Sequence, residues 1–212
     1  NRGINRQDIF LNKDDYLHFL ELYSIFTGPV AKSYAYCLMK NHFHFLVYIK
    51  QPDDIGYLNP QYAKSKDLYK KWKVTFSSEK DELPGIQFKN KPLPDKMFQH
   101  LFSAYAKWFN TKHQRTGSLL EHPFNRILVD NEKYLRRILV YIHMNPVKHG
   151  FCRHPVEYSW ISYLPFLSDK VSTLQRREAF AWFESKSDFE LDHNKDQNFD
   201  DIQDYLFEFY NT

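Results

Sequence analysis

The chain has 212 residues, 42% of them hydrophobic and 18% aromatic, which is enough for a sizeable core and argues against a disordered chain. No apolar run approaches the roughly 20 residues of a membrane span and no signal peptide is visible, so we expect a cytoplasmic protein without a membrane partner. The net charge of +3 is uneven: residues 1–164 hold 24 Lys and Arg against 15 Asp and Glu, whereas residues 165–212 hold 5 against 11.

This basic main body suits a polyanion such as nucleic acid, and a solvated charged surface explains it equally well. The cysteines, Cys37 and Cys152, lack the spacing of a metal site, so we interpret them as reduced.

The first clear element is a helix between Asn12 and Pro29. Asn12 is suited to cap its N-terminus, apolar residues recur at helical spacing from Tyr16 to Phe26, and Gly28-Pro29 ends it. The next twenty residues, AKSYAYCLMKNHFHFLVYIK, predict a hairpin with its turn at Met39 to Asn41.

Further elements follow from periodicity and from proline and glycine positions. They are an insertion at about 51–95 with a short helix near 64–72, a helix over 95–114, a strand near 124–129, a helix over 131–144 that Pro146 ends, a helix over 172–185, a charged linker over 186–198 and an acidic helix over 199–210.

The order is helix, strand, strand, helix, strand, helix. With one more strand, which we expect before Asn1, it becomes βαββαβ, an α+β sandwich of the ferredoxin-like kind with helices on one face. We expect one domain over residues 1–165 and a helical acidic C-terminal extension over 166–212.

Two histidines stand in the middle of the second strand. Residues i and i+2 of a strand share a face, so His42 and His44 present two imidazoles side by side while the phenylalanines beside them face the core. Such a pair suits a divalent ion, and two ordinary sheet histidines fit the pattern as well.

Tyr141 and Asn145 lie four residues apart on a predicted helix and share a face. The amide oxygen of Asn145 suits Mg²⁺ or Mn²⁺, and the Tyr141 hydroxyl is a nucleophile that needs help from a metal or a base. A core tyrosine above an asparagine is the other interpretation. Together with the histidines, these types fit attack of a tyrosine on a metal-polarised phosphodiester.

MKNHFH (Met39–His44) resembles the His-hydrophobe-His motif of the one-tyrosine HUH transposases. YIHMNPVK (Tyr141–Lys148) resembles the tyrosine-helix motif of the branch associated with repetitive extragenic palindromes. The opening NRGINRQDIF, HQRTGSLLEHPFNR (His113–Arg126) and EYSWISY (Glu157–Tyr163) are also similar to that branch. The resemblance covers roughly residues 1–50 and 96–165.

The resemblance implies a four-stranded antiparallel sheet, a homodimer, and cutting of single-stranded DNA near hairpins through a 5′-phosphotyrosine with a free 3′-OH. By position, His42, His44 and Asn145 are the metal ligands and Tyr141 the nucleophile. The family often has proline where this chain has Lys40, and the insertion at about 51–95 is longer than expected; it either grips DNA or is solvated.

We expect phosphate contacts from six basic residues, Arg2, Arg6, Lys40, Arg115, Arg126 and Lys148. His143 is predicted to point away from Tyr141, as a structural residue or a contact to DNA. The leading hypothesis is a metal-dependent enzyme that nicks and joins DNA. A domesticated, non-cleaving binder of DNA or RNA hairpins is the alternative, and a sandwich that binds RNA on its sheet lacks its expected signature.

Overall fold

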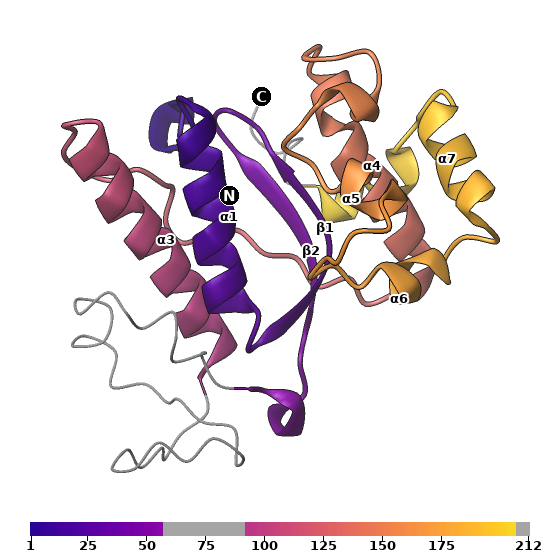
Figure 1. Ribbon diagram of the computed structural model, residues 1–212, viewed down its shortest axis with the longest axis horizontal. Helices are drawn as coiled ribbons and strands as arrows, with labels where there is room; N and C mark the ends of the chain where they lie inside the picture. Colours follow the sequence, from indigo (N-terminus) through magenta and orange to yellow (C-terminus); the bar gives the residue numbers. More distant parts are fainter. Residues whose placement is uncertain (57–91, 207–212) are drawn as a thin grey trace. The chain divides into compact units, whose positions relative to one another are not determined.

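The computed structural model describes residues 1–56 and 92–206 (Figure 1). The expected helix near 64–72 lies outside these residues. The chain divides into two compact units: unit 1 is Asn1–Leu11, Ser33–Val47 and Ser118–Thr212, and unit 2 is Asn12–Lys32 and Tyr48–Gly117. Residues 166–212 thus belong to the same unit as the hairpin, and the expected domain boundary at 165 stays a prediction.

The predicted hairpin is confirmed. β1 (Ala31–Leu38) pairs with β2 (Phe43–Ile49). Hydrogen bonds from Met39 N to His42 O, 2.8 Å, and from Lys50 N to Val30 O, 3.0 Å, close its two ends. β2 consists largely of β-branched and aromatic residues, which suit a pleated, half-buried surface, and β1 contributes Tyr34 and Tyr36.

The four-stranded sheet is not observed, because the sheet within residues 1–56 and 92–206 has two strands. The strand expected near 124–129 is wrong: these residues form no ladder and alternate only between half-buried and exposed. Isolated bridges from Arg2 to His42, Gly3 to Leu120 and Cys37 to Ile161 extend the pairing in unit 1 by single residues.

Unit 2 contains two long helices that contact each other, α1 (Lys13–Thr27) and α3 (Pro94–Lys112) (Figure 1). Both agree with prediction, including the N-cap at Asn12, whose N–H donates to Asp15 Oδ2 at 3.1 Å. Asp15 is fully buried, and its Oδ1 lies 2.9 Å from Lys112 Nζ and 3.0 Å from His113 Nε2. The carboxylate therefore both caps α1 and ties it to the C-terminal end of α3.

In unit 1, α4 (Leu135–Lys148) supplies the centre of the core. Its buried residues include Leu139, Tyr141 and Ile142, which join Leu46 of β2 in one hydrophobic cluster. The prediction that Pro146 ends the helix is wrong. A proline in the last turn removes a single donor, and the helix continues to Lys148.

The helices of the C-terminal region differ from expectation. They are α5 (Tyr163–Leu167), α6 (Arg176–Phe180), α7 (Lys186–Asn194) and a 3₁₀ segment, Asp200–Tyr205. The linker expected over 186–198 is wrong for its first nine residues: Ser185 Oγ accepts from Asp188 N at 3.0 Å and caps α7, and Phe189 and His193 bury one face.

Four single 3₁₀ turns complete the described elements: Ile4–Arg6, Pro52–Asp54, Glu132–Tyr134 and Pro155–Glu157. Within residues 1–56 and 92–206 no helix combines the length and apolar character needed to cross a membrane.

Candidate active site

The N-terminal segment holds the turn that precedes the histidines. Gly3 N donates to Asn41 O at 2.8 Å, and Arg2 forms a bridge with His42. A Cβ atom on Gly3 would lie 2.1 Å from Gln7 O, so only glycine fits this close approach. The Asn-Arg-Gly sequence therefore fixes the backbone from which His42 projects.

Asn41 sets the protonation of His42. Asn41 Nδ2 donates to Arg6 O at 3.3 Å, which turns its Oδ1 toward His42 Nδ1 at 2.7 Å. An amide oxygen only accepts hydrogen bonds, so Nδ1 carries the proton and the buried Nε2 carries the lone pair. This orienting contact is typical of imidazoles that bind metal ions.

His44 follows two residues later with its ring centroid 5.2 Å from that of His42 and an interplanar angle of 84°. Two imidazoles that bind one ion at about 2.1 Å place their centroids about 5 Å apart. The face is less open than the alternation suggests, because Leu46, on the same face, is buried in the cluster with α4. His42 and His44 therefore lie on the face of β2 that faces α4.

The other two residues of the predicted site, Tyr141 and Asn145, lie on α4. The Tyr141 ring lies 6.0 Å from the His44 ring. Asn145 is fully buried, and its Nδ2 donates to Tyr141 O at 3.1 Å. Its Oδ1 is also buried, and within residues 1–56 and 92–206 no group donates a hydrogen bond to it. Buried amide oxygens normally have a partner, so this one is available to an ion.

Imidazole nitrogens and an amide oxygen are donor types that suit a divalent ion, and the role of His42, His44 and Asn145 as its ligands stays a prediction. Among the described residues no three His, Cys, Asp or Glu side chains form a set able to hold a metal; the predicted set has two such side chains and one amide oxygen. His149, which the sequence analysis missed, lies at the C-terminal end of α4 with its ring 5.5 Å from that of His42. His149 directly follows the YIHMNPVK motif in the sequence, and this position was the signal that could have identified it.

Tyr141 is covered in this structure. Only 2% of its surface is exposed. The ring of Phe199, from the C-terminal region, packs edge-on against it at 5.1 Å, and Lys148 Nζ lies 5.1 Å from the ring centroid. The periodicity that predicts a helix from residue 199 does not reveal this contact of Phe199, because it joins residues 58 positions apart.

His143 and His193 form a buried pair on another face of α4. His143 Nδ1 lies 3.0 Å from His193 Nε2, and His143 Nε2 lies 2.7 Å from Ser162 Oγ. Burial, then the neighbouring His193, holds the pKa of His143 well below its usual value. Burial lowers the pKa of His193 to about 4. Of the two roles predicted for His143, a structural residue or a contact to DNA, its burial and hydrogen bonds agree with the structural one.

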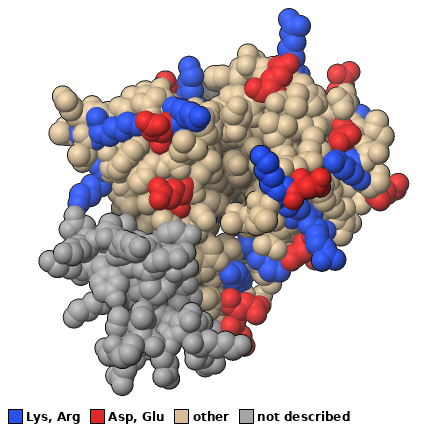
Figure 2. Space-filling model, in the orientation of Figure 1, with Lys and Arg blue, Asp and Glu red and all other residues tan. Residues whose placement is uncertain are grey.

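The six candidate phosphate contacts have different surroundings. Arg2 Nε pairs with Glu121 Oε1 at 2.8 Å, the Arg126 guanidinium lies 5.5 Å from the Phe124 ring centroid, and Lys40 is exposed. In unit 2, Arg115 Nη1 donates to Asn110 Oδ1 at 2.7 Å. Arg6 and Lys148 are exposed in unit 1. Figure 2 shows basic and acidic side chains interspersed on the face drawn there.

Comparison with known proteins gives one similar structure to report. No protein-family model matches the chain, and no curated protein matches it. A solved structure of a REP-associated tyrosine transposase bound to a REP hairpin aligns over 79% of this chain and 76% of its own, with 13% identical residues and a TM-score of 0.47. Similarity at this level does not establish a shared activity, which has to be argued from the site.

Proposed function

We propose that this chain is a metal-dependent enzyme that nicks and rejoins single-stranded DNA through its tyrosine. The observation that supports the proposal is the approach, in unit 1, of the His42–His44 pair of the hairpin to the Tyr141 ring, with the buried Asn145 oxygen four residues further along the same helix. Phosphodiester transfer needs a nucleophile, a cation and little else, since catalysis rests on position and electrostatics.

In the proposed reaction the Tyr141 oxygen attacks phosphorus in line with the 3′-oxygen. A tyrosine O–P bond forms as the P–O3′ bond breaks. Tyr141 releases its phenolic proton to solvent, and the leaving 3′-oxygen takes up a proton from solvent. The products are a 5′-phosphotyrosine and a free 3′-OH, and the reverse reaction rejoins the strand. A bound Mg²⁺ or Mn²⁺ supplies polarisation of the phosphodiester, and imidazole ligation favours Mn²⁺.

The chain's own residues divide the remaining work. Asn41 keeps the lone pair of His42 on Nε2, and the Tyr141 carbonyl orients the Asn145 amide so that its oxygen faces away from the helix backbone. Lys148, above the Tyr141 ring, is placed to contact a phosphate next to the nucleophile. Since Phe199 covers the tyrosine, that side chain has to move before DNA can reach it.

Burial of Tyr141 also favours a second candidate, a protein that binds DNA hairpins without cutting them. A nucleophile that is 2% exposed cannot reach phosphorus in this conformation. The two candidates make opposite predictions about a covalent product, and they agree about binding.

The test is formation of a covalent adduct. Labelled single-stranded hairpin DNA is incubated with the protein and Mn²⁺ or Mg²⁺ and then resolved under denaturing conditions. We expect a labelled protein band that chelator abolishes and that Tyr141→Phe removes. Tyr134→Phe, the same change just before α4, is the matched control and should keep the band.

A Phe199→Ala variant in the same experiment distinguishes the nicking enzyme from the non-cleaving binder. It should increase the yield of adduct if the enzyme is active but covered. Binding of the hairpin without adduct, in both the wild-type protein and Phe199→Ala, would support the non-cleaving binder. A band that survives Tyr141→Phe would exclude Tyr141 as the nucleophile.

A further inference from the structure

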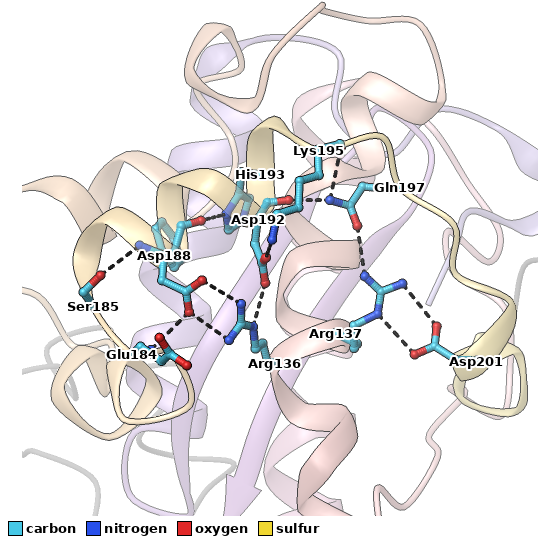
Figure 3. A network of polar contacts seen from close by, with 11 residues as sticks. Arg136, Arg137, Glu184, Ser185, Asp188, Asp192, His193, Lys195, Gln197 and Asp201 are labelled. Atoms are coloured by element: carbon cyan, nitrogen blue, oxygen red, sulfur yellow. Dashed lines mark hydrogen bonds and ion pairs between the residues drawn. The ribbon is translucent and has the colours of Figure 1, made fainter.

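Two adjacent arginines of α4 hold the C-terminal region in different ways (Figure 3). Arg136 contacts α7: its Nε donates to Asp192 Oδ2 at 2.6 Å and its Nη1 lies 2.8 Å from Asp188 Oδ2. Arg137 contacts the segment after α7, which we call the cover segment, residues 197–201. Successive helix residues point about 100° apart, so the arginines serve different faces.

Every polar contact of Arg137 within the described part of the chain is with the cover segment. Its Nε and Nη2 each lie 3.2 Å from an oxygen of the Asp201 carboxylate, a fork-to-fork pairing. Its Nη1 donates to Gln197 Oε1 at 3.1 Å, and Nη2 also donates to the Asn198 carbonyl. The guanidinium fork thus binds a planar anion.

The cover segment places an aromatic ring and an anion where a nucleotide would place a base and a phosphate. Arg137 lies one turn before Tyr141 on the same face of α4. The Phe199 ring packs against both, 5.1 Å from the Tyr141 ring and 5.1 Å from the Arg137 guanidinium carbon. Bases stack on aromatic rings and arginine in the same manner, and a phosphate accepts the same bidentate fork as a carboxylate.

We propose that Arg137 is a binding site for a backbone phosphate of single-stranded DNA, and that Asp201 occupies it when DNA is absent. This inference rests on the proposed DNA-binding function and names a contact that lies outside the six basic residues expected from the sequence. The Arg137 and Asp201 side chains are 30% and 48% exposed, so an exchange of carboxylate for phosphate requires only movement of the cover segment.

The alternative is that Arg137 only anchors the cover segment, as Arg136 anchors α7. The two models predict opposite effects of Arg137→Gln on the affinity for DNA. If Arg137 is only an anchor, Arg137→Gln and Asp201→Asn both loosen the segment and both strengthen DNA binding. If Arg137 binds phosphate, Asp201→Asn strengthens binding and Arg137→Gln weakens it.

The experiment measures the affinity of a fluorescent single-stranded DNA hairpin by anisotropy, with chelator present so that no cutting occurs, over a range of salt concentrations. Removal of an exposed competing ion pair should raise the affinity of Asp201→Asn about two- to fivefold. Arg137→Gln should bind about tenfold more weakly, and the negative slope of log affinity against log salt should become shallower by about 0.7. The double variant should match Arg137→Gln.

Charge-matched controls come from the neighbouring positions. Asp200→Asn removes the same charge from a side chain that contacts Asn198 and Gln203, so it should change the affinity less than Asp201→Asn. Arg136→Gln should leave the salt slope unchanged. If Arg137→Gln does not fold, Arg137→Lys retains the charge without the fork and should bind more weakly than wild type.

Equal or tighter binding by the folded Arg137 variant, or equal effects of the two aspartate changes, would overturn the inference. Absence of DNA binding by the wild-type protein would remove both this inference and the proposed function. Binding with the predicted signs but without a covalent adduct would support the phosphate site and reject the cutting activity alone.

Discussion

Lowering the pH below about 6.5 should destabilise unit 1 through the buried His143–His193 pair. His193 has an ordinary pKa of 6.5 and a folded pKa of about 4, lowered by burial, and the pKa of His143 is lowered in the same direction. Between these values the unfolded chain binds protons that the folded chain does not, so stability is complete above pH 6.5 and is lost as the pH falls toward 4.

The magnitude follows from about 1.4 kcal/mol per pH unit for each histidine in this window. From pH 7 to pH 5.5 the pair should cost about 2–3 kcal/mol of the free energy of unfolding, and His193→Gln should remove about half of that dependence. The glutamine retains an oxygen that can accept the hydrogen bond from His143 Nδ1.

The assay is urea denaturation followed by tryptophan fluorescence at several pH values between 5.5 and 7.5. Asp192→Asn is the control. Burial opposes the charged form of Asp192, but hydrogen bonds from Arg136 and Lys195 prevail and keep its pKa below 3.8, so this change should lower stability without altering its slope with pH. If His193→Gln retains the full pH dependence of the wild-type protein, the buried pair is not its source.

Three further substitutions test local contacts within the two units, each by chemical denaturation. Gly3→Ala should cost more than about 1 kcal/mol, because its Cβ would meet Gln7 O at 2.1 Å; unchanged stability would show that this loop relaxes freely. Ser185→Ala should cost about 1 kcal/mol through loss of the cap of α7, whereas Ser185→Asp should retain the cap. Asp15→Asn should cost about 2–3 kcal/mol, because Lys112 Nζ and His113 Nε2 lose the buried carboxylate oxygen that they contact; a loss below about 1 kcal/mol would mean that the pairing is unimportant.

Local signals predicted the elements whose sequence pattern is strong. The cap at Asn12, the apolar spacing of the first helix and the alternation around the Met39–Asn41 turn all lead to elements that the structure contains. The error over 186–198 has a clear physical cause. Charges dominate the sequence over 186–198, yet Phe189 and His193, one turn apart, are sufficient to dock a capped helix.

The candidate site was predictable in its parts, and their roles stay predictions. Spacing placed His42 with His44 and Tyr141 with Asn145, since both pairs depend on local periodicity. The proximity of His44 to Tyr141 needed the resemblance as well, because strand and helix are almost a hundred residues apart. The positions of Phe199 and Arg137 could not be predicted, since long-range packing alone brings them together.

Contacts on several faces hold α4 in place, and they limit how the chain can vary in length. Arg136 is held by α7, Tyr141 lies against His44, and His143 bonds to Ser162 and His193. One inserted or deleted residue turns everything beyond it by about 100°. No single-residue insertion or deletion between Arg136 and His143 can keep all these contacts, so this stretch should tolerate substitution far better than a change of length.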